Sequence, residues 1–88
     1  MRLKYNFSIN KVANQYTAVA IGDDAKAFHN IIFLNHVSKV IFEYLKQDVT
    51  MEMLINGVYD SFEGDLEVIR DEVIRFVNQL HDLDLIID

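Results

Sequence analysis

The sequence predicts an α+β fold in which a small antiparallel sheet is backed by helices, and three observations support this. The chain has 88 residues, 51% of them hydrophobic and 11% aromatic, which suits one packed domain over 1–88. Before Asn35 the apolar residues come in short runs typical of strands. After Asn35 they recur at helical spacing. A sheet this small has an edge, and an open edge can capture an extended peptide.

The first part of the chain predicts three strands in an antiparallel meander. Residues 5–12 alternate apolar and polar at their start, and residues 16–21 form a more buried run. The Gly- and Asp-rich segment 22–26 predicts a loop. Residues 27–34 carry large apolar side chains on both alternating sets, which predicts a third strand. That strand is either covered on both faces or lies at the sheet edge, where it forms a groove with the last helix.

The remainder predicts three helices, each of which begins after a polar capping residue. Asn35, Thr50 and Asp65 can each accept a hydrogen bond from a free amide of the first turn. The second and third helices are joined by a short turn and form a helix-turn-helix-like pair. On the wet face of the third helix, Asp71 and Arg75 are expected to pair. The expected core stripe of this helix is Leu66, Ile69, Val73, Phe76, Leu80 and Leu83.

The charges are unevenly distributed along the chain. Residues 1–46 have a net charge of +3 and residues 47–88 of −9. An acidic half opposes binding to a phosphate backbone, so no nucleic-acid partner is expected. No run approaches the ~18 apolar residues of a membrane span, so no membrane partner is expected either. The absence of cysteine and of a secretion signal at the start is consistent with a cytoplasmic protein.

The sequence contains no recognisable catalytic constellation. The histidines are scattered and lack the spacing of a metal site, and no serine lies in a nucleophile motif. Three glycines cannot form a phosphate-binding loop. We therefore expect no enzyme activity, no metal and no cofactor.

Several segments follow one another in the order and spacing of a known family pattern. They are Leu34-Asn35, Ile41-Phe42-Glu43-Tyr44-Leu45, Thr50-Met51-Glu52-Met53-Leu54, the helical run from Asp71 to Leu80, and Leu85-Ile86. On these segments the chain resembles, over nearly its whole length, the PqqD-like family, which is named for the D protein of pyrroloquinoline quinone (coenzyme PQQ) synthesis. Its members are also called RiPP recognition elements. The chain departs from the pattern at Phe42, where the family often has Trp, and at Asp84, where it usually has Gly.

The resemblance implies a winged helix-turn-helix fold, with a three-stranded antiparallel sheet followed by three helices. It also implies that the chain binds the leader segment of a ribosomally synthesised precursor peptide. The leader would add as a strand at the third strand and be presented to a separate modifying enzyme, such as a radical S-adenosylmethionine maturase. Carried onto this chain, the peptide-binding residues are Phe28, His29, Asn30, Ile31, Ile32 and Phe33 of the strand and Arg70, Ile74 and Val77 of the helix.

Two of these helix residues have an alternative role, and so does the whole chain. Ile74 could widen the core face, and Arg70 could pair with Glu67. The chain could also be a winged-helix regulator or a general protein-interaction module. In the latter case the exposed strand edge would pair with a second copy to give a homodimer.

Overall fold

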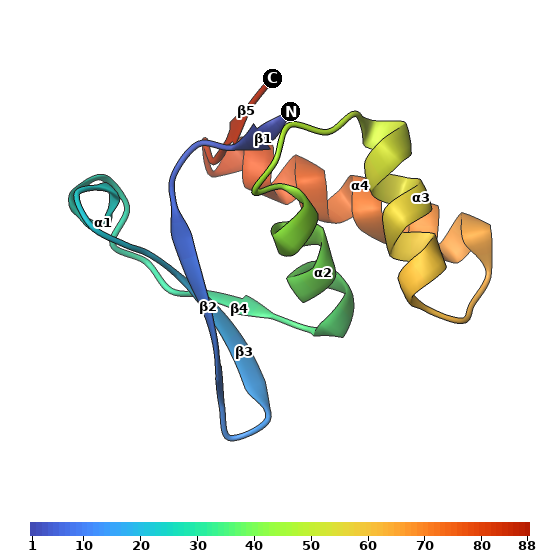
Figure 1. The fold of residues 1–88 in the computed structure, drawn as a ribbon, viewed down its shortest axis with the longest axis horizontal. Helices are drawn as coiled ribbons and strands as arrows, with labels where there is room; N and C mark the ends of the chain where they lie inside the picture. The colour runs from blue at the N-terminus through green and yellow to red at the C-terminus, as the bar shows by residue number, and fades with distance from the viewer.

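The computed structural model describes all 88 residues and shows a three-stranded antiparallel sheet with four helices, so the predicted α+β class is confirmed. The strands are β1 (Arg2–Leu3), β2 (Phe7–Val12), β3 (Gln15–Ala20), β4 (Ile32–Leu34) and β5 (Ile86–Ile87). The helices are α1 (Asp24–Ala27), α2 (His36–Tyr44), α3 (Met51–Ser61) and α4 (Leu66–Asp82). Figure 1 shows α2, α3 and α4 grouped together, with the β2–β3 hairpin projecting away from them. None of the helices has the length and apolar run that crossing a membrane requires.

The β2–β3 hairpin turns at Ala13 and Asn14, which both have positive φ, 49° and 67°. Two consecutive residues of this kind form a type I′ turn, whose twist matches that of the flanking strands. The turn sets Val12 opposite Gln15 and thereby the register of the whole hairpin. Strand β4 pairs antiparallel with the other side of β3, so the sheet order is β2-β3-β4.

The expected strand over 27–34 is largely wrong, because Ala27 ends α1, residues 28–31 are irregular and only β4 remains of it. The Asp24 carboxylate accepts a hydrogen bond from the Asn6 amide at 2.8 Å, which holds α1 against the entrance to β2. The Phe28 ring then packs edge-on to Phe7 with 5.8 Å between ring centroids. Part of the apolar run therefore anchors a loop to the core and does not extend the sheet.

The three predicted capping residues are confirmed. The Asn35 side chain accepts a hydrogen bond from the Ser38 amide, and the Ser38 hydroxyl accepts one from the Asn35 amide, both at 2.8 Å. This reciprocal capping box fixes the start of α2 directly after β4. Thr50 and Asp65 each accept a backbone hydrogen bond in the first turn of α3 and α4, at 3.1 and 2.8 Å.

The core lies between the sheet and the helices and is centred on Phe42, which is fully buried. Its ring packs against Phe7 at 5.1 Å and faces Phe76 at 6.2 Å between centroids. The stripe that α4 buries differs from the predicted one, because Leu66 and Leu83 are exposed. The buried α4 residues are Ile69, Val73, Val77 and Leu80.

The end of the chain closes the core by pairing with its beginning. Strand β5 forms a second, two-stranded antiparallel ladder with β1, in which Leu3 stands opposite Ile86. Leu85 is fully buried, and its carbonyl accepts a hydrogen bond from the Lys4 amide at 2.8 Å. Figure 1 shows the two termini side by side. The apolar end of the chain thus packs into the core through a small ladder of its own.

Candidate functional site

The hydrogen-bond pattern of the hairpin determines which backbone groups of the sheet are already used. The Ile21 amide donates to the Asn6 carbonyl at 3.0 Å, so this pair is hydrogen-bonded across β2 and β3. Bonded and non-bonded pairs alternate in an antiparallel ladder. Thr17, four residues before Ile21, therefore directs its backbone groups toward β2. Tyr16 and Ala18 direct theirs the other way, toward β4.

Within β4 this alternation leaves one residue unpaired. Ile32 and Leu34 stand opposite Ala18 and Tyr16 and bond to β3. Phe33 stands opposite Thr17 and directs both its N–H and its C=O away from β3. Because β4 is the last strand of the sheet, these two groups point out from an open edge.

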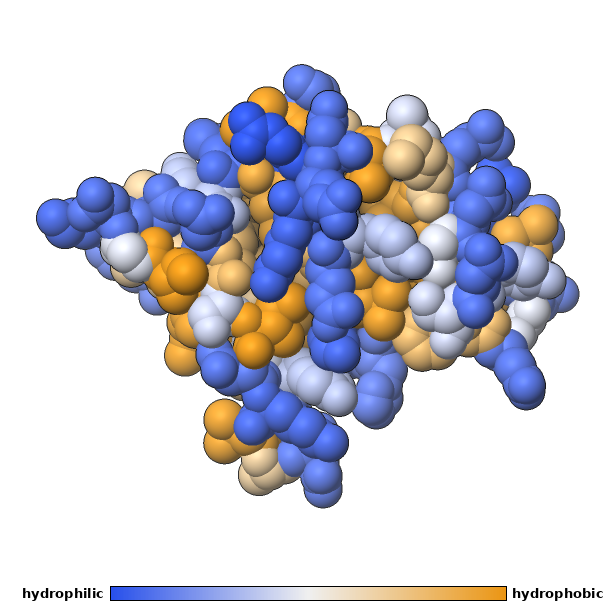
Figure 2. All heavy atoms as spheres, viewed as in Figure 1, coloured by the Kyte–Doolittle hydropathy of each residue, from blue (hydrophilic) through white to orange (hydrophobic).

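A hollow of about 260 Å³ lies beside this edge. It is bounded by the end of β4, the first turns of α2 and one face of α4. The α4 residues follow the helical spacing i, i+3, i+4 and i+7. Figure 2 shows hydrophobic residues reaching the surface between the hairpin and α2, where Figure 1 places β4. The lining residues are Phe33, Asn35, Ser38, Ile41, Glu72, Arg75, Phe76 and Gln79.

The lining of the hollow is mostly polar and includes a smaller apolar part. Phe76 is half-buried and can offer apolar surface to a side chain that enters, whereas Ile41 is fully buried beneath it. Glu72, Arg75 and Gln79 surround them on α4. Arg75 forms no ion pair, contrary to the expected pairing with the carboxylate four residues before it. Its guanidinium is therefore free to donate to a ligand.

The strand part of the predicted site is only partly at this edge. Phe33 borders the hollow and Ile32 lies beside it in β4, whereas Ile31 is exposed just before the strand. His29 and Asn30 are also exposed, in an irregular segment. Phe28 is half-buried against the core.

The predicted α4 residues do not line the hollow. Val77 is 1% exposed and belongs to the core, so it does not border the hollow. Ile74 is half-buried against the core, as in the alternative that the sequence left open. Arg70 is half-buried and forms no ion pair, neither with Glu67 nor with any other carboxylate.

Sequence reasoning missed the α4 face that does border the hollow. The expected core stripe places Phe76 at its centre. In the structure Phe76 is half-buried and lies at the border of the buried face of α4. The available signal was the set of polar residues at helical spacing around it, namely Glu72, Arg75 and Gln79. An aromatic residue with polar neighbours at helical spacing typically lies between the buried and the exposed face of its helix.

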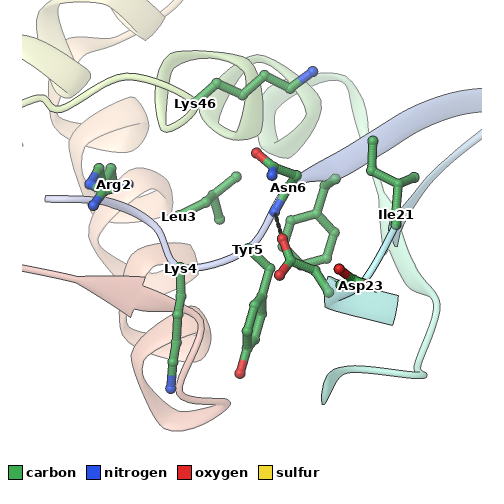
Figure 3. A pocket seen from close by; sticks show the side chains of 11 residues that line it. Arg2, Leu3, Lys4, Tyr5, Asn6, Ile21, Asp23 and Lys46 are labelled. Atoms are coloured by element: carbon green, nitrogen blue, oxygen red, sulfur yellow. Dashed lines mark hydrogen bonds between the residues drawn. The ribbon is translucent and has the colours of Figure 1, made fainter. Parts of the chain in front are cut away.

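A second, larger hollow of about 720 Å³ lies between the first residues of the chain, the loop before α1 and the end of α2. Figure 3 shows Lys4 and Tyr5 on the same side of the chain there, and the hydrogen bond from the Asn6 amide to Asp24. Lys4 donates to Asp84 at 2.8 Å, and this hydrogen bond raises the pKa of the lysine. The two hollows share no lining residue.

Comparison with known proteins places the chain in a family. Residues 19–86 match the model of the family described as coenzyme PQQ synthesis protein D (PqqD). The matched span contains β4, α2, α3 and α4, and thus every residue that lines the hollow beside β4. No curated protein and no solved structure matches the chain. The resemblance found in the sequence is confirmed, and the chain belongs to the coenzyme PQQ synthesis protein D (PqqD) family.

Proposed function

We propose that this chain binds the leader segment of a ribosomally synthesised precursor peptide as an added strand on β4. It then presents the peptide to a separate modifying enzyme, such as a radical S-adenosylmethionine maturase, and carries out no chemistry itself. Membership of the PqqD family supports a role in the biosynthesis of PQQ or of related ribosomal peptides as a peptide-binding partner. The observation that carries the proposal is that Phe33 directs both backbone groups out of an open edge beside a hollow.

In this arrangement the peptide forms a hydrogen-bonded pair with Phe33 through two backbone hydrogen bonds. Side chains alternate along a strand, so the peptide residues on either side of the paired one share the face of Ile32 and Leu34. That face is directed toward the helices, because Leu34 is buried there. A hollow of about 260 Å³ has the volume of roughly nine water molecules at ~30 Å³ each, which is room for one or two side chains.

The side chain in the hollow supplies most of the affinity. Two backbone hydrogen bonds contribute about 0.5–1.5 kcal/mol each, whereas association costs at least about 4 kcal/mol. Burial of one large apolar side chain against Phe76 adds up to about 1.5–3 kcal/mol. A hydrogen bond from the Arg75 guanidinium to a peptide carbonyl or carboxylate adds about 1.5–3 kcal/mol. Leaders are therefore selected by an apolar residue next to an acceptor and not by backbone pairing alone.

We further propose that the fold is a winged helix-turn-helix in which the β2–β3 hairpin is the wing. Supporting features are the short turn between α3 and α4 and the hairpin that projects beyond the helices in Figure 1. The helix α4 carries four carboxylates against two arginines, which repels a duplex. Its open face is then used for a peptide in place of nucleic acid.

Two arginine variants test the proposal on the same helix. The probes are fluorescent synthetic peptides that cover the short open reading frames encoded beside this gene, and binding is followed by anisotropy. Arg75→Ala removes the free guanidinium at the hollow and is expected to weaken binding about tenfold or more, from a charged hydrogen bond of ~1.5–3 kcal/mol. Arg70→Ala is the matched control, because Arg70 lies on α4 outside the hollow and has no ion pair.

Two results would contradict the proposal. One is that no peptide binds up to about 1 mM, which corresponds to ~4 kcal/mol. The other is that Arg70→Ala abolishes binding while Arg75→Ala leaves it unchanged.

A further inference from the structure

The short irregular segment between α1 and β4 has a backbone that the fold does not use. His29, Asn30 and Ile31 neither donate a hydrogen bond to another backbone group nor accept one from it. The side chains of all three are exposed, and that of Ile31 is 55% exposed. The segment leads directly into β4 at Ile32. Free backbone groups therefore continue from the open edge of β4 toward the start of the chain.

The neighbouring strand β3 has unpaired backbone groups on the same side. Ala20 directs its N–H and C=O toward β4, as Tyr16 and Ala18 do, because alternate residues of a strand bond to the same neighbour. The ladder with β4 ends where Ile32 stands opposite Ala18. One further bonded pair in this register joins Ala20 to Asn30. Ala20 is only 9% exposed, and buried backbone groups are the ones that gain most from a partner.

The other end of β4 is closed to further pairing. Two residues after Phe33, Asn35 is the next residue at a position that faces the open edge. The Asn35 amide donates to the Ser38 hydroxyl at 2.8 Å, and the Asn35 carbonyl accepts from the Lys39 amide at 2.9 Å. The start of α2 thus uses both groups. A peptide that pairs with Phe33 can lengthen its ladder only toward Ile31.

We propose that a bound leader lengthens β4 to Asn30, so that the peptide pairs with Ile31 as well as with Phe33. This inference rests on the proposed strand addition. Fixing Asn30 and Ile31 costs conformational entropy, which hydrogen bonds to Ala20 alone do not offset in the free chain. The peptide adds hydrogen bonds on the other side of the same segment. The longer strand therefore forms only when β3 and the peptide flank it together.

The longer ladder defines the kind of leader segment that binds. Ile31 and Phe33 lie two residues apart, so in an extended strand they share the face opposite the helices. They are 55% and 65% exposed in the free chain. The peptide residues paired with them lie on the same face, where apolar or β-branched side chains pack against both. The recognised segment is therefore extended, with apolar residues at positions i and i+2, in addition to the side chain that enters the hollow beside α4.

Amide hydrogen exchange of the isotope-labelled chain tests this inference, measured by NMR with and without a bound peptide from the open reading frames beside the gene. The Asn30 and Ile31 amides are expected to exchange freely in the free chain and at least about tenfold more slowly in the complex, together with Phe33. Protection of Phe33 alone overturns the inference and leaves strand addition standing. A complex in which none of the three amides is protected overturns both, as does the absence of any binding peptide.

Proline variants test the same pairs by affinity. Asn30→Pro removes the amide expected to bond to Ala20, and Ile31→Pro removes one expected to bond to the peptide. Each should bind about 3- to 10-fold more weakly than its alanine counterpart, the ratio for one backbone hydrogen bond. His29→Pro is the matched control and should bind like His29→Ala, because Phe28 before it is already extended, with φ of −137° and ψ of 111°. Equal binding of the proline and alanine variants at both Asn30 and Ile31 overturns the inference.

Discussion

Proline at two adjacent positions of β4 distinguishes the open side of the strand from the paired side. The Ile32 amide is directed to Ala18, which is fully buried. Ile32→Pro removes that hydrogen bond and leaves a buried carbonyl without a donor. The expected loss relative to Ile32→Ala is about 2–4 kcal/mol of unfolding free energy. The Phe33 amide points to solvent, so Phe33→Pro removes no hydrogen bond and should lie within about 1 kcal/mol of Phe33→Ala.

Urea unfolding followed by circular dichroism measures all four variants, since the chain has no tryptophan to report by fluorescence. Equal costs for the two prolines, or a larger cost at Phe33, would refute the assigned alternation of hydrogen bonds in β4. The same comparison extends to peptide binding. Phe33→Pro should bind about 3- to 10-fold more weakly than Phe33→Ala, because one of the two backbone hydrogen bonds is gone.

Three further variants test local features of the fold. Ala13 has φ of 49°, which costs a residue other than glycine about 1–2 kcal/mol, so Ala13→Gly should raise the unfolding free energy by up to about 1 kcal/mol; a lower urea midpoint would contradict this. Asn35→Ala removes the cap of α2 and should cost about 1 kcal/mol, seen as a lower melting temperature, whereas an unchanged value would mean that the cap is redundant. The hydrogen bond to Glu43 raises the pKa of Lys39 above its ordinary 10.5, so this pair stabilises the fold at all pH values below that and the contribution disappears as pH rises through the raised pKa. Lys39→Met should therefore be less stable than the wild type by the same amount at about pH 7 and about pH 9, and the difference should shrink as the pH rises through the raised pKa of Lys39.

Features determined by neighbouring residues could be predicted from the sequence. The hairpin strands follow from alternation within one short run, and α2, α3 and α4 each begin where a side chain can reach an amide two or three residues ahead. The family resemblance rested on the same local signals in the right order, and β4, which lies in the strand that it singled out, is one of the two edge strands of the sheet. Phe33 was thus among the expected binding residues.

Features that depend on distant contacts could not be predicted. The large apolar residues of 27–34 predict one strand, but Phe28 packs on Phe7, and the ladder with β3 includes only Ile32–Leu34. The β1–β5 ladder joins two segments of two residues each, which are too short to give a periodic signal. The orientation of α4 depends on which apolar stripe meets Phe42 across the core, and Val77 and Phe76 were both compatible with helical spacing.

The central claim is that a peptide adds as a strand to β4, and an NMR titration of the isotope-labelled chain tests it most directly. The ligands are the peptides encoded beside the gene, and the observables are amide shifts and amide exchange rates. The account predicts that shifts concentrate at residues 31–34 and 72–79 and that the Phe33 amide becomes protected from exchange on binding. Protection at β2, shifts confined to the face of the sheet opposite the helices, or binding that leaves the Phe33 amide exchanging freely would contradict strand addition at β4.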